Sequence, residues 1–364
     1  MGRDYLCLKD ASMNAPVKPS TLPVLDFREF DGSPESRTAF LEKLRIAARE
    51  TGFFYLIGHG IDLEFLTDLF ALSRRFFDLP EAEKLAVEMV NSPHFRGYTR
   101  VGWEHTRGER DWREQLDVGA EREKAVAKAE DPGWVRLQGP NQWPEAIPEL
   151  KPAILRWQQE ATALAVRLTR AFAQSLRQAP DVFEPIYAER PNQLVKIIRY
   201  PGRHATQSEQ GVGAHKDSGF VTVLLQHQQS GLQVDGPNGW IDAPPLPGSF
   251  IINVGELLEM ASNGYFKATV HRVTTPPAGN DRLSIAFFLG ARLDSTVPVL
   301  SLDPDLASEA KGIAQDPLNP LFREVGKNYL KGRLRSHPDV ARRHYADLLS
   351  AEELAKPAGP GSAY

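Results

Sequence analysis

The spacing of apolar residues divides the chain into a mainly helical first half and a strand-rich second half. Apolar positions recur at helical intervals over residues 36–51, 63–77 and 147–177, a period typical of helices that bury one face. The third stretch carries a long apolar stripe of Ile154, Trp157, Ala161, Leu164, Leu168 and Phe172. Two short apolar runs, residues 22–27 and 53–57, predict strands within this half.

From residue 192 onward, short runs of β-branched and aromatic residues alternate with Gly, Pro and Asn turns. These runs are LVKIIRY, GFVTVLLQ, GLQV, GWIDA, SFIINV, ATVHRV and RLSIAFFLG. Seven or eight strands after a helical half predict an α+β fold, mainly β, with a double-stranded β-helix (jelly roll) core flanked by helices. We therefore expect a loose leader (1–20), a mixed helical region packing on the core (21–190), the jelly-roll core (191–295) and a helical C-terminal region with a frayed tail (296–364).

Composition and charge narrow the class of protein. The chain has 364 residues, 41% hydrophobic and 25% charged, as in ordinary globular proteins. A net charge of −4 offers no attraction for nucleic acid or an anionic membrane, and no apolar run approaches the ~20 residues of a membrane span. The single cysteine, Cys7, excludes a disulfide framework. We expect a cytoplasmic protein with a small-molecule substrate, and the composition leaves the oligomeric state open.

A candidate metal site begins with His215 and Asp217, in the sequence GAHKD. Residues i and i+2 of an extended segment point to the same side, so both side chains face one way. His271 follows in the strand-like run ATVHRV, after about four predicted strands that can return the chain to the same end of a barrel. Two imidazoles and one carboxylate on one face of a metal form the facial triad of non-haem Fe(II) oxygenases.

Each histidine also has an ordinary explanation. Taken singly, His215 could be a turn residue and His271 a satisfied core histidine. Zinc accepts the same three ligands, although usually in a tighter four-coordinate site. We interpret His59 and His227 as structural or surface histidines.

A candidate anion site lies in the next predicted strand, DRLSIAFF, where Arg282 and Ser284 share one face. An arginine pointing into a barrel lined by Phe and Ile is costly unless an anion meets it. Its guanidinium suits a carboxylate, and the serine hydroxyl adds a further hydrogen bond. A dicarboxylate that chelates the metal at one end would satisfy both sites. The alternative is that Arg282 is a solvated strand residue.

Together these residues resemble the isopenicillin N synthase-like 2-oxoglutarate/Fe(II) oxygenases. The resemblance covers nearly the whole chain from about residue 22, and its motifs occur in family order: LPVLDF, ETGFFYLIGHGI, RRFFDLPEAEK, RDWREQLDVG, HKDSGFVTVLLQ, GLQV, PPLPGSFIINVGELLEMASNG, KATVHRV and RLSIAFFLG. It implies that iron is bound by His215, Asp217 and His271. It also implies that Arg282 and Ser284 clamp the cosubstrate.

The resemblance implies further roles. Tyr200, in Arg-Tyr-Pro, would hydrogen-bond the cosubstrate, and Asn253 would face the cosubstrate region and support it. The implied enzyme is a dioxygenase that uses Fe(II), 2-oxoglutarate and O₂ to hydroxylate, desaturate or cyclise a small molecule, releasing succinate and CO₂. Two positions depart from the family: Ile198 stands where many plant members have Asn, and Lys216 replaces Thr or Ser, with its side chain expected to point away from the metal.

Two alternatives remain open at this point. An isopenicillin N synthase-type Fe(II) oxidase needs no 2-oxoglutarate, but it carries a C-terminal glutamine that reaches the iron. This chain has no Gln after Gln315, which disfavours the oxidase. A non-catalytic jelly-roll binding protein would have no reason to keep a buried Arg282.

The prime substrate is the least defined part of the prediction. We expect the mouth of the site to be lined by Tyr98, Trp103, Phe220, Gln226 and Phe288, although core packing explains each equally well. Residues 104–113 form a charged segment, expected to be a loop near the opening. Its arginines Arg107, Arg110 and Arg113 could meet an acidic substrate, but solvated loop charges are the usual explanation.

Overall fold

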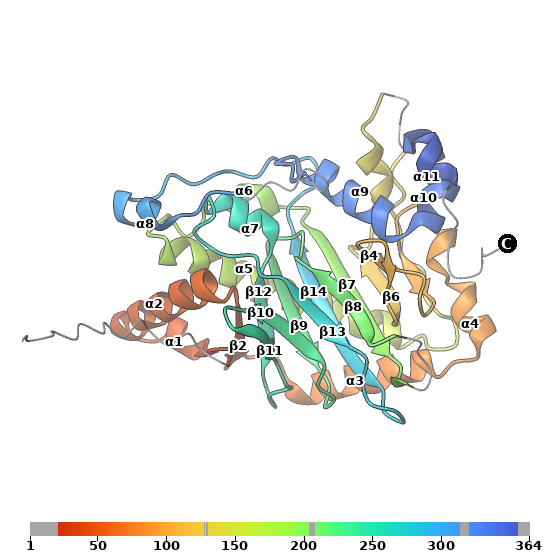
Figure 1. Ribbon diagram of the computed structural model, residues 1–364, viewed down its shortest axis with the longest axis horizontal. Helices are drawn as coiled ribbons and strands as arrows, with labels where there is room; N and C mark the ends of the chain where they lie inside the picture. Colours follow the sequence, from red (N-terminus) through yellow and green to blue (C-terminus); the bar gives the residue numbers. More distant parts are fainter. Residues whose placement is uncertain (1–20, 127, 129, 204–207, 314–319, 356–364) are drawn as a thin grey trace, which may run out of the picture.

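Two facing β-sheets form the protein, and the long helices of the N-terminal region cover the outer face of the larger sheet (Figure 1). The computed structural model describes residues 21–126, 128, 130–203, 208–313 and 320–355. The expected leader over 1–20, which contains Cys7, and the expected frayed tail over 357–364 lie outside these residues. None of the helices in the described ranges is long and apolar enough to cross a membrane.

The bounds of the elements are as follows. The strands are β1 (Val24–Asp26), β2 (Phe53–Ile57), β3 (Gly97–Thr99), β4 (His105–Thr106), β5 (Glu109–Arg110), β6 (Glu114–Gly119), β7 (Asn192–Tyr200), β8 (Gln210–His215), β9 (Val221–Gln226), β10 (Leu232–Gly236), β11 (Gly239–Asp242), β12 (Phe250–Val254), β13 (His271–Thr274) and β14 (Arg282–Gly290). The helices are α1 (Arg28–Asp31), α2 (Pro34–Glu50), α3 (Leu63–Phe77), α4 (Glu81–Ala86), α5 (Leu150–Ser175), α6 (Glu184–Tyr187), α7 (Glu256–Ala261), α8 (Pro304–Glu309), α9 (Val325–Ser336), α10 (Pro338–His344) and α11 (Ala351–Ala355).

The larger sheet has eight strands in the order β1-β2-β12-β9-β14-β7-β6-β3, and the smaller has four in the order β11-β10-β13-β8. All neighbouring pairs are antiparallel except β1 and β2. Strands β1, β2, β3 and β6 come from the N-terminal region, so this region and the jelly roll share one sheet. This arrangement confirms the predicted α+β, mainly β, jelly-roll fold.

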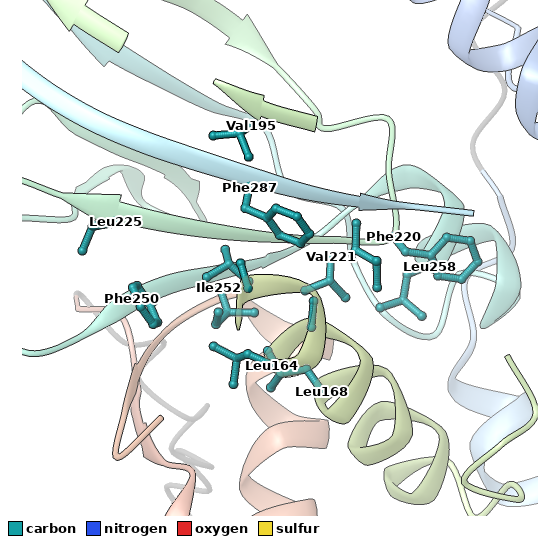
Figure 2. Close-up of a cluster of buried hydrophobic side chains, with 14 of the residues drawn as sticks. Leu164, Leu168, Val195, Phe220, Val221, Leu225, Phe250, Ile252, Leu258 and Phe287 are labelled. Atoms are coloured by element: carbon teal, nitrogen blue, oxygen red, sulfur yellow. The ribbon is translucent and has the colours of Figure 1, made fainter. Parts of the chain in front are cut away.

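The main hydrophobic core fills the space between the larger sheet and the helices. Helix α5 packs its apolar stripe on this sheet, and Figure 2 shows Leu164 and Leu168 of α5 facing Ile252 and Phe287 of the strands. Buried phenylalanines and leucines of α2 and α3 extend the same cluster. Burial of one large apolar side chain stabilises the fold by about 1.5–3 kcal/mol, so this layer is a major source of stability.

A second, smaller core lies between the two sheets. It combines Tyr55, Ile198 and Ile251 of the larger sheet with apolar residues of the smaller one: Val212, Leu232, Val234, Ile241 and Val273. Because side chains alternate along a strand, β2, β7, β9 and β12 contribute to both layers. On β14, odd-numbered residues such as Phe287 join the helix-side core, and even-numbered residues such as Arg282 and Ser284 face the space between the sheets.

Local signals explain where helices begin and end. Helix α2 starts after Ser33, whose hydroxyl accepts from the Ser36 N–H at 3.3 Å, and α3 starts after Asp62, which caps Glu64 N–H at 3.0 Å. Gly52 then stops α2 with φ +66, and a Cβ there would lie 2.0 Å from the Lys267 carbonyl oxygen. Only glycine fits this turn, which brings β2 directly onto the sheet.

The predicted elements are largely observed. Helix α3 and strand β2 have the predicted bounds, and eight strands follow residue 192. In the run ATVHRV, however, the strand begins only at His271. Strand β6 was not predicted, because its sequence EQLDVG places buried polar residues on the face where a strand normally shows apolar ones.

Candidate metal centre

His215, Asp217 and His271 converge at one end of the space between the sheets. Their nearest ligand atoms all lie within 4.8 Å of one another. The convergence follows from sheet pairing, since β13 and β8 are neighbours and His271 lies directly opposite His215. The two imidazole rings have centroids 4.3 Å apart, and Asp217 follows two residues after the end of β8.

Backbone carbonyls orient both imidazoles. The Nδ1 of His215 lies 2.8 Å from the carbonyl oxygen of Gly213, and the Nδ1 of His271 lies 3.3 Å from that of Thr269. A carbonyl can only accept, so this geometry assigns the proton to Nδ1 and leaves the Nε2 lone pair free. The two Nε2 atoms face Oδ1 of Asp217 at 3.6 and 3.7 Å.

Two hydrogen bonds hold the carboxylate of Asp217 on the side away from the imidazoles. Its Oδ2 accepts from the Thr222 hydroxyl at 2.6 Å and from the Asn253 side-chain amide at 2.8 Å. Oδ1 therefore remains available on the side of the imidazoles. Burial alone would raise the pKa of Asp217, but the facing His271 and His215 hold it well below its usual range.

These features fit a bound divalent metal ion. Burial and the neighbouring His215 lower the pKa of His271 to about 4, which favours the neutral imidazole that a metal requires. Three ligand atoms on one face, each steadied by a second hydrogen bond, match a facial triad. The side chain of His215 is 31% exposed, so the site opens on that side. Lys216 points away and pairs with Glu259 of α7 at 3.0 Å.

Arg282 is fully buried on the same inner face. Its guanidinium donates to the Ser284 hydroxyl at 3.1 Å and to Oε1 of Gln226 at 2.7 Å. Tyr200 of β7 lies directly opposite Arg282 of β14. The guanidinium carbon is 5.0 Å from the centroid of the phenol ring. Among the described residues its Nε has no hydrogen-bond partner, and no carboxylate lies within 4.0 Å. Burial lowers the pKa of Arg282, and an external carboxylate would relieve that cost.

A group of charged side chains that the sequence did not predict lies on the inner face of β6 and β7. We call it the inner ionic cluster: Glu104, Asp111, Arg113, Asp117, Lys196 and Arg333. Glu104 accepts from Arg113 and from Lys196, both at 2.7 Å, and Asp117 accepts from Arg333 of α9 at 2.9 Å. The alternation of polar and apolar residues along RDWREQLDVG was the signal that could have located it.

Asp111 of this cluster connects the β4–β5 hairpin to β8. Its Oδ1 accepts from the Gly213 N–H at 3.0 Å, and its Oδ2 accepts from Thr106 at 2.8 Å and Arg113 at 3.3 Å. Gly213 is also the residue whose carbonyl orients His215. The two ends of the segment 104–113 are therefore anchored by buried ion pairs, and Arg113 is part of them. The tip of the hairpin is exposed, so Arg107 and Arg110 have the solvated charges that its composition suggested.

The five residues expected at the mouth of the site lie in different parts of the structure. Phe288 lies on the face of Arg282 and Ser284, and Gln226 contacts Arg282 directly. Trp103 is half-buried beneath the guanidinium of Arg100.

For Tyr98 and Phe220 the expectation is wrong. Tyr98 belongs to the helix-side core, and its hydroxyl donates to Glu114 on the outer face of β6 at 2.6 Å. Phe220 packs edge-on against Phe183 and Tyr187 in the same core, as Figure 2 shows for its position. Each aromatic ring buries more apolar surface there than it would at an open mouth.

The two histidines interpreted as structural have packing roles. His59 is buried against Phe250, with ring centroids 4.1 Å apart, and its Nδ1 accepts from the Ile61 N–H. His227 packs edge-on against Phe70. Both lie outside the convergent group of possible metal ligands.

Known proteins resemble this chain over most of its length. Residues 22–146 match the family described as the N-terminal region of non-haem dioxygenases in morphine synthesis, and residues 191–291 match the 2OG-Fe(II) oxygenase superfamily. The chain is 34% identical to the 2-oxoglutarate-dependent dioxygenase frbJ of Dothideomycetidae sp., covering 91% of this chain and 94% of that protein. It is 36% identical to a homoarginine-6-hydroxylase of Arabidopsis thaliana, covering 72% and 80%.

Solved structures agree with these relatives. A full-length Neurospora crassa protein in complex with alpha-KG and 5-formyluracil superposes with a TM-score of 0.67 at 26% identity, covering 89% of this chain and 96% of that one. The dioxygenase for auxin oxidation of rice superposes with a TM-score of 0.62 at 27% identity, covering 88% and 99%. The cosubstrate-free oxidase is not favoured by these matches. The chain belongs to the 2-oxoglutarate/Fe(II)-dependent dioxygenases, which use Fe(II), 2-oxoglutarate and O₂ to oxidise small organic substrates.

Proposed function

We propose that His215, Asp217 and His271 bind the Fe(II) of this dioxygenase. The observation that carries the proposal is the convergence of three ligand atoms within 4.8 Å, together with a buried Arg282 on the inner face of the sheet that forms no ion pair with any described residue. When bound, Fe(II) would supply the site at which O₂ and the 2-oxo acid react, with release of succinate and CO₂. Thr222 and Asn253 would keep Oδ1 of Asp217 turned towards the metal.

The carboxylate of 2-oxoglutarate distant from the metal would be bound by Arg282 and Ser284. The guanidinium would orient it through a two-point contact, and Ser284 would share its hydroxyl between Arg282 and the ligand. Tyr200 and Gln226 would fix the arginine side chain from two sides. Phe288, on the same face, would exclude water beside the metal and contact the prime substrate.

We propose that the reaction outcome is hydroxylation, because a relative 36% identical to this chain is named a homoarginine-6-hydroxylase. Homoarginine is therefore the first compound to test. The single cysteine supports a cytoplasmic location, and the charge of −4 supports a protein without nucleic-acid or membrane partners. Separation of cell extracts into soluble and membrane fractions tests this location.

The test of the site begins with anaerobic titration of the Fe(II) protein with 2-oxoglutarate. The wild-type protein should develop the visible charge-transfer band of a chelated 2-oxo acid. Asp217→Ala should bind no Fe(II), and Arg282→Leu should bind Fe(II) normally but need much more 2-oxoglutarate. Arg292→Leu is the matched control, because Arg292 lies beyond β14 and pairs with Asp294 at the surface. Unchanged Fe(II) affinity in Asp217→Ala would overturn the ligand assignment.

A further inference from the structure

Four arginines of the described residues are buried: Arg96, Arg113, Arg282 and Arg333. Two of them are neutralised within the protein, because Arg113 pairs with Glu104 and Asp111, and Arg333 pairs with Asp117. Arg282 would bind the distant carboxylate of 2-oxoglutarate under the function proposed above. Arg96 has no such explanation.

Arg96 is 3% exposed and poorly satisfied. Its one hydrogen bond to a described residue runs from Nη1 to the Phe95 carbonyl at 3.4 Å, and its buried Nε has no partner among those residues. No carboxylate of the described chain lies within 4.0 Å of it. A buried cation without a paired anion is energetically costly, so natural proteins rarely retain one.

The charged residues near Arg96 do not supply an anion for it either. The inner ionic cluster contains three cations (Arg113, Lys196, Arg333) and three carboxylates (Glu104, Asp111, Asp117), so it is balanced without Arg96. The nearby His337 adds no charge at neutral pH, because burial lowers its pKa to about 3. Burial also lowers the pKa of Arg96 itself, and the nearby Tyr329 phenol and Asp117 carboxylate, which is already paired with Arg333, oppose this only in part. One anion from outside the protein would complete the balance.

The guanidinium of Arg96 lies on the face of the sheet that carries the site. A Cβ on Gly119 would lie 2.1 Å from Nε of Arg96, so the side chain crosses β6 where glycine leaves space. Gly119 shares a face with Asp117, which lies two residues earlier and is directly opposite Lys196. That is also the face of Arg282 and Ser284.

One row of residues connects this position to the metal centre. Gly119 lies opposite Leu194, Leu194 opposite Phe288, and Phe288 opposite Thr222. The hydroxyl of Thr222 holds the candidate ligand Asp217. Neighbouring strands are about 4.8 Å apart, so Gly119 and Thr222 are separated by about 14 Å across the sheet. Leu194 and Phe288 lie between them on the same face.

We propose that Arg96 binds a carboxylate of the prime substrate, which lies across Leu194 and Phe288 with its oxidised carbon at the metal. The prime substrate is thus an organic acid whose reacting carbon lies several bonds from the carboxylate. This inference rests on the proposed function, since it takes the metal centre as the place of reaction.

The test measures binding to the anaerobic holoenzyme loaded with Fe(II) and saturating 2-oxoglutarate. The probes are homoarginine and straight-chain amino and carboxylic acids of four to seven carbons, each paired with its primary amide. At least one acid should bind and stimulate succinate release on admission of O₂, roughly 100-fold better than its amide. A panel in which no acid binds, or in which acids and amides bind equally, overturns the proposal.

Variants locate the effect. Arg96→Gln should lose roughly 100-fold in affinity for the acid and little for the amide, whereas Arg96→Lys should keep a preference for the acid. Arg100→Gln is the control, because Arg100 is four residues away and pairs with Glu88 outside the site. An Arg96→Gln variant with an unchanged preference for the acid would exclude Arg96 as its binding group.

Two further readings separate this inference from the proposed function. The charge-transfer band in the same samples reports on the metal and 2-oxoglutarate, so its presence without acid selectivity rejects the inference alone. Melting temperature without substrate provides the second reading. Removing an unpaired buried charge should leave Tm of Arg96→Met unchanged or raised, whereas a clear fall in Tm would assign Arg96 a structural role instead.

Discussion

Replacing Thr222 by Val tests whether the hydrogen bonds behind Asp217 maintain the metal centre. The substitution nearly preserves volume but removes the hydroxyl that donates to Oδ2 at 2.6 Å. Asn253 would then hold the carboxylate alone, at 2.8 Å. The carboxylate can rotate about its remaining contact, so Oδ1 would no longer be fixed towards His215 and His271.

The magnitude follows from the strength of the lost contact. A hydrogen bond to a charged group contributes about 1.5–3 kcal/mol, and each 1.4 kcal/mol corresponds to a tenfold change in a binding constant. Fe(II) affinity of Thr222→Val should therefore fall roughly 10- to 100-fold, as is typical when a hydrogen bond to a metal ligand is removed. Anaerobic Fe(II) titration, followed by the charge-transfer band at saturating 2-oxoglutarate, measures this change.

Two controls separate orientation of the ligand from general damage. Thr222→Ser keeps the hydroxyl and should retain most of the affinity. Thr169→Val removes another buried hydroxyl, one that donates to the Val166 carbonyl within α5, and should change stability without changing Fe(II) affinity. If folded Thr222→Val binds Fe(II) within a factor of two of the wild type, the orienting role of this hydroxyl is refuted.

Three other predictions concern the inner ionic cluster and its neighbours. Lys196→Met removes one of two cations from buried Glu104 and should lower the free energy of unfolding by about 3 kcal/mol in urea; a change below about 1 kcal/mol would contradict this. Burial holds the pKa of His337 at about 3, so below pH 6.5 the unfolded chain gains a proton that the folded protein does not. The wild type should therefore lose about 2 kcal/mol of stability between pH 6.5 and 5 relative to His337→Gln, and parallel pH profiles would reject this. Asp111→Asn should accelerate hydrogen exchange at the Gly213 amide and weaken Fe(II) binding about tenfold; unchanged exchange would show that Asp111 does not fix β8.

The placement of the metal-binding candidates could be predicted because it depends on few local rules. Alternation along an extended segment oriented His215 and Asp217 together, and the number of intervening strands returned His271 to the same end of the sheets. The inward direction of Arg282 follows from the same alternation. These rules need only the period of the strand and the count of strands, and both are visible in the sequence.

The surroundings of the site could not be predicted in this way. The sequences around Tyr98 and Phe220 are compatible with either layer of the fold. Their position in the helix-side core depends on ring contacts with residues distant in the chain: Phe76 for Tyr98, and Phe183 and Tyr187 for Phe220. The charged segment 104–113 has the composition of a surface loop. The burial of Glu104 at its start depends on Lys196, 92 positions further along the chain, and a single sequence gives no pattern that pairs the two.

The alternating faces of β14 have a consequence for how such a protein can change. Phe287 and its odd-numbered neighbours pack against α5, whereas Ser284 and Phe288 face the space between the sheets, where we propose that the reaction takes place. Exchange of an even-numbered residue can therefore alter the accepted molecule while the helical layer stays intact. A single-residue insertion inside β14, between Ser284 and Ile285, would do the opposite, because the residues on one side of it would turn to the other face of the sheet. Either Arg282 and Ser284 would then enter the hydrocarbon layer or Phe287 would leave it, so folding and catalysis would be lost together.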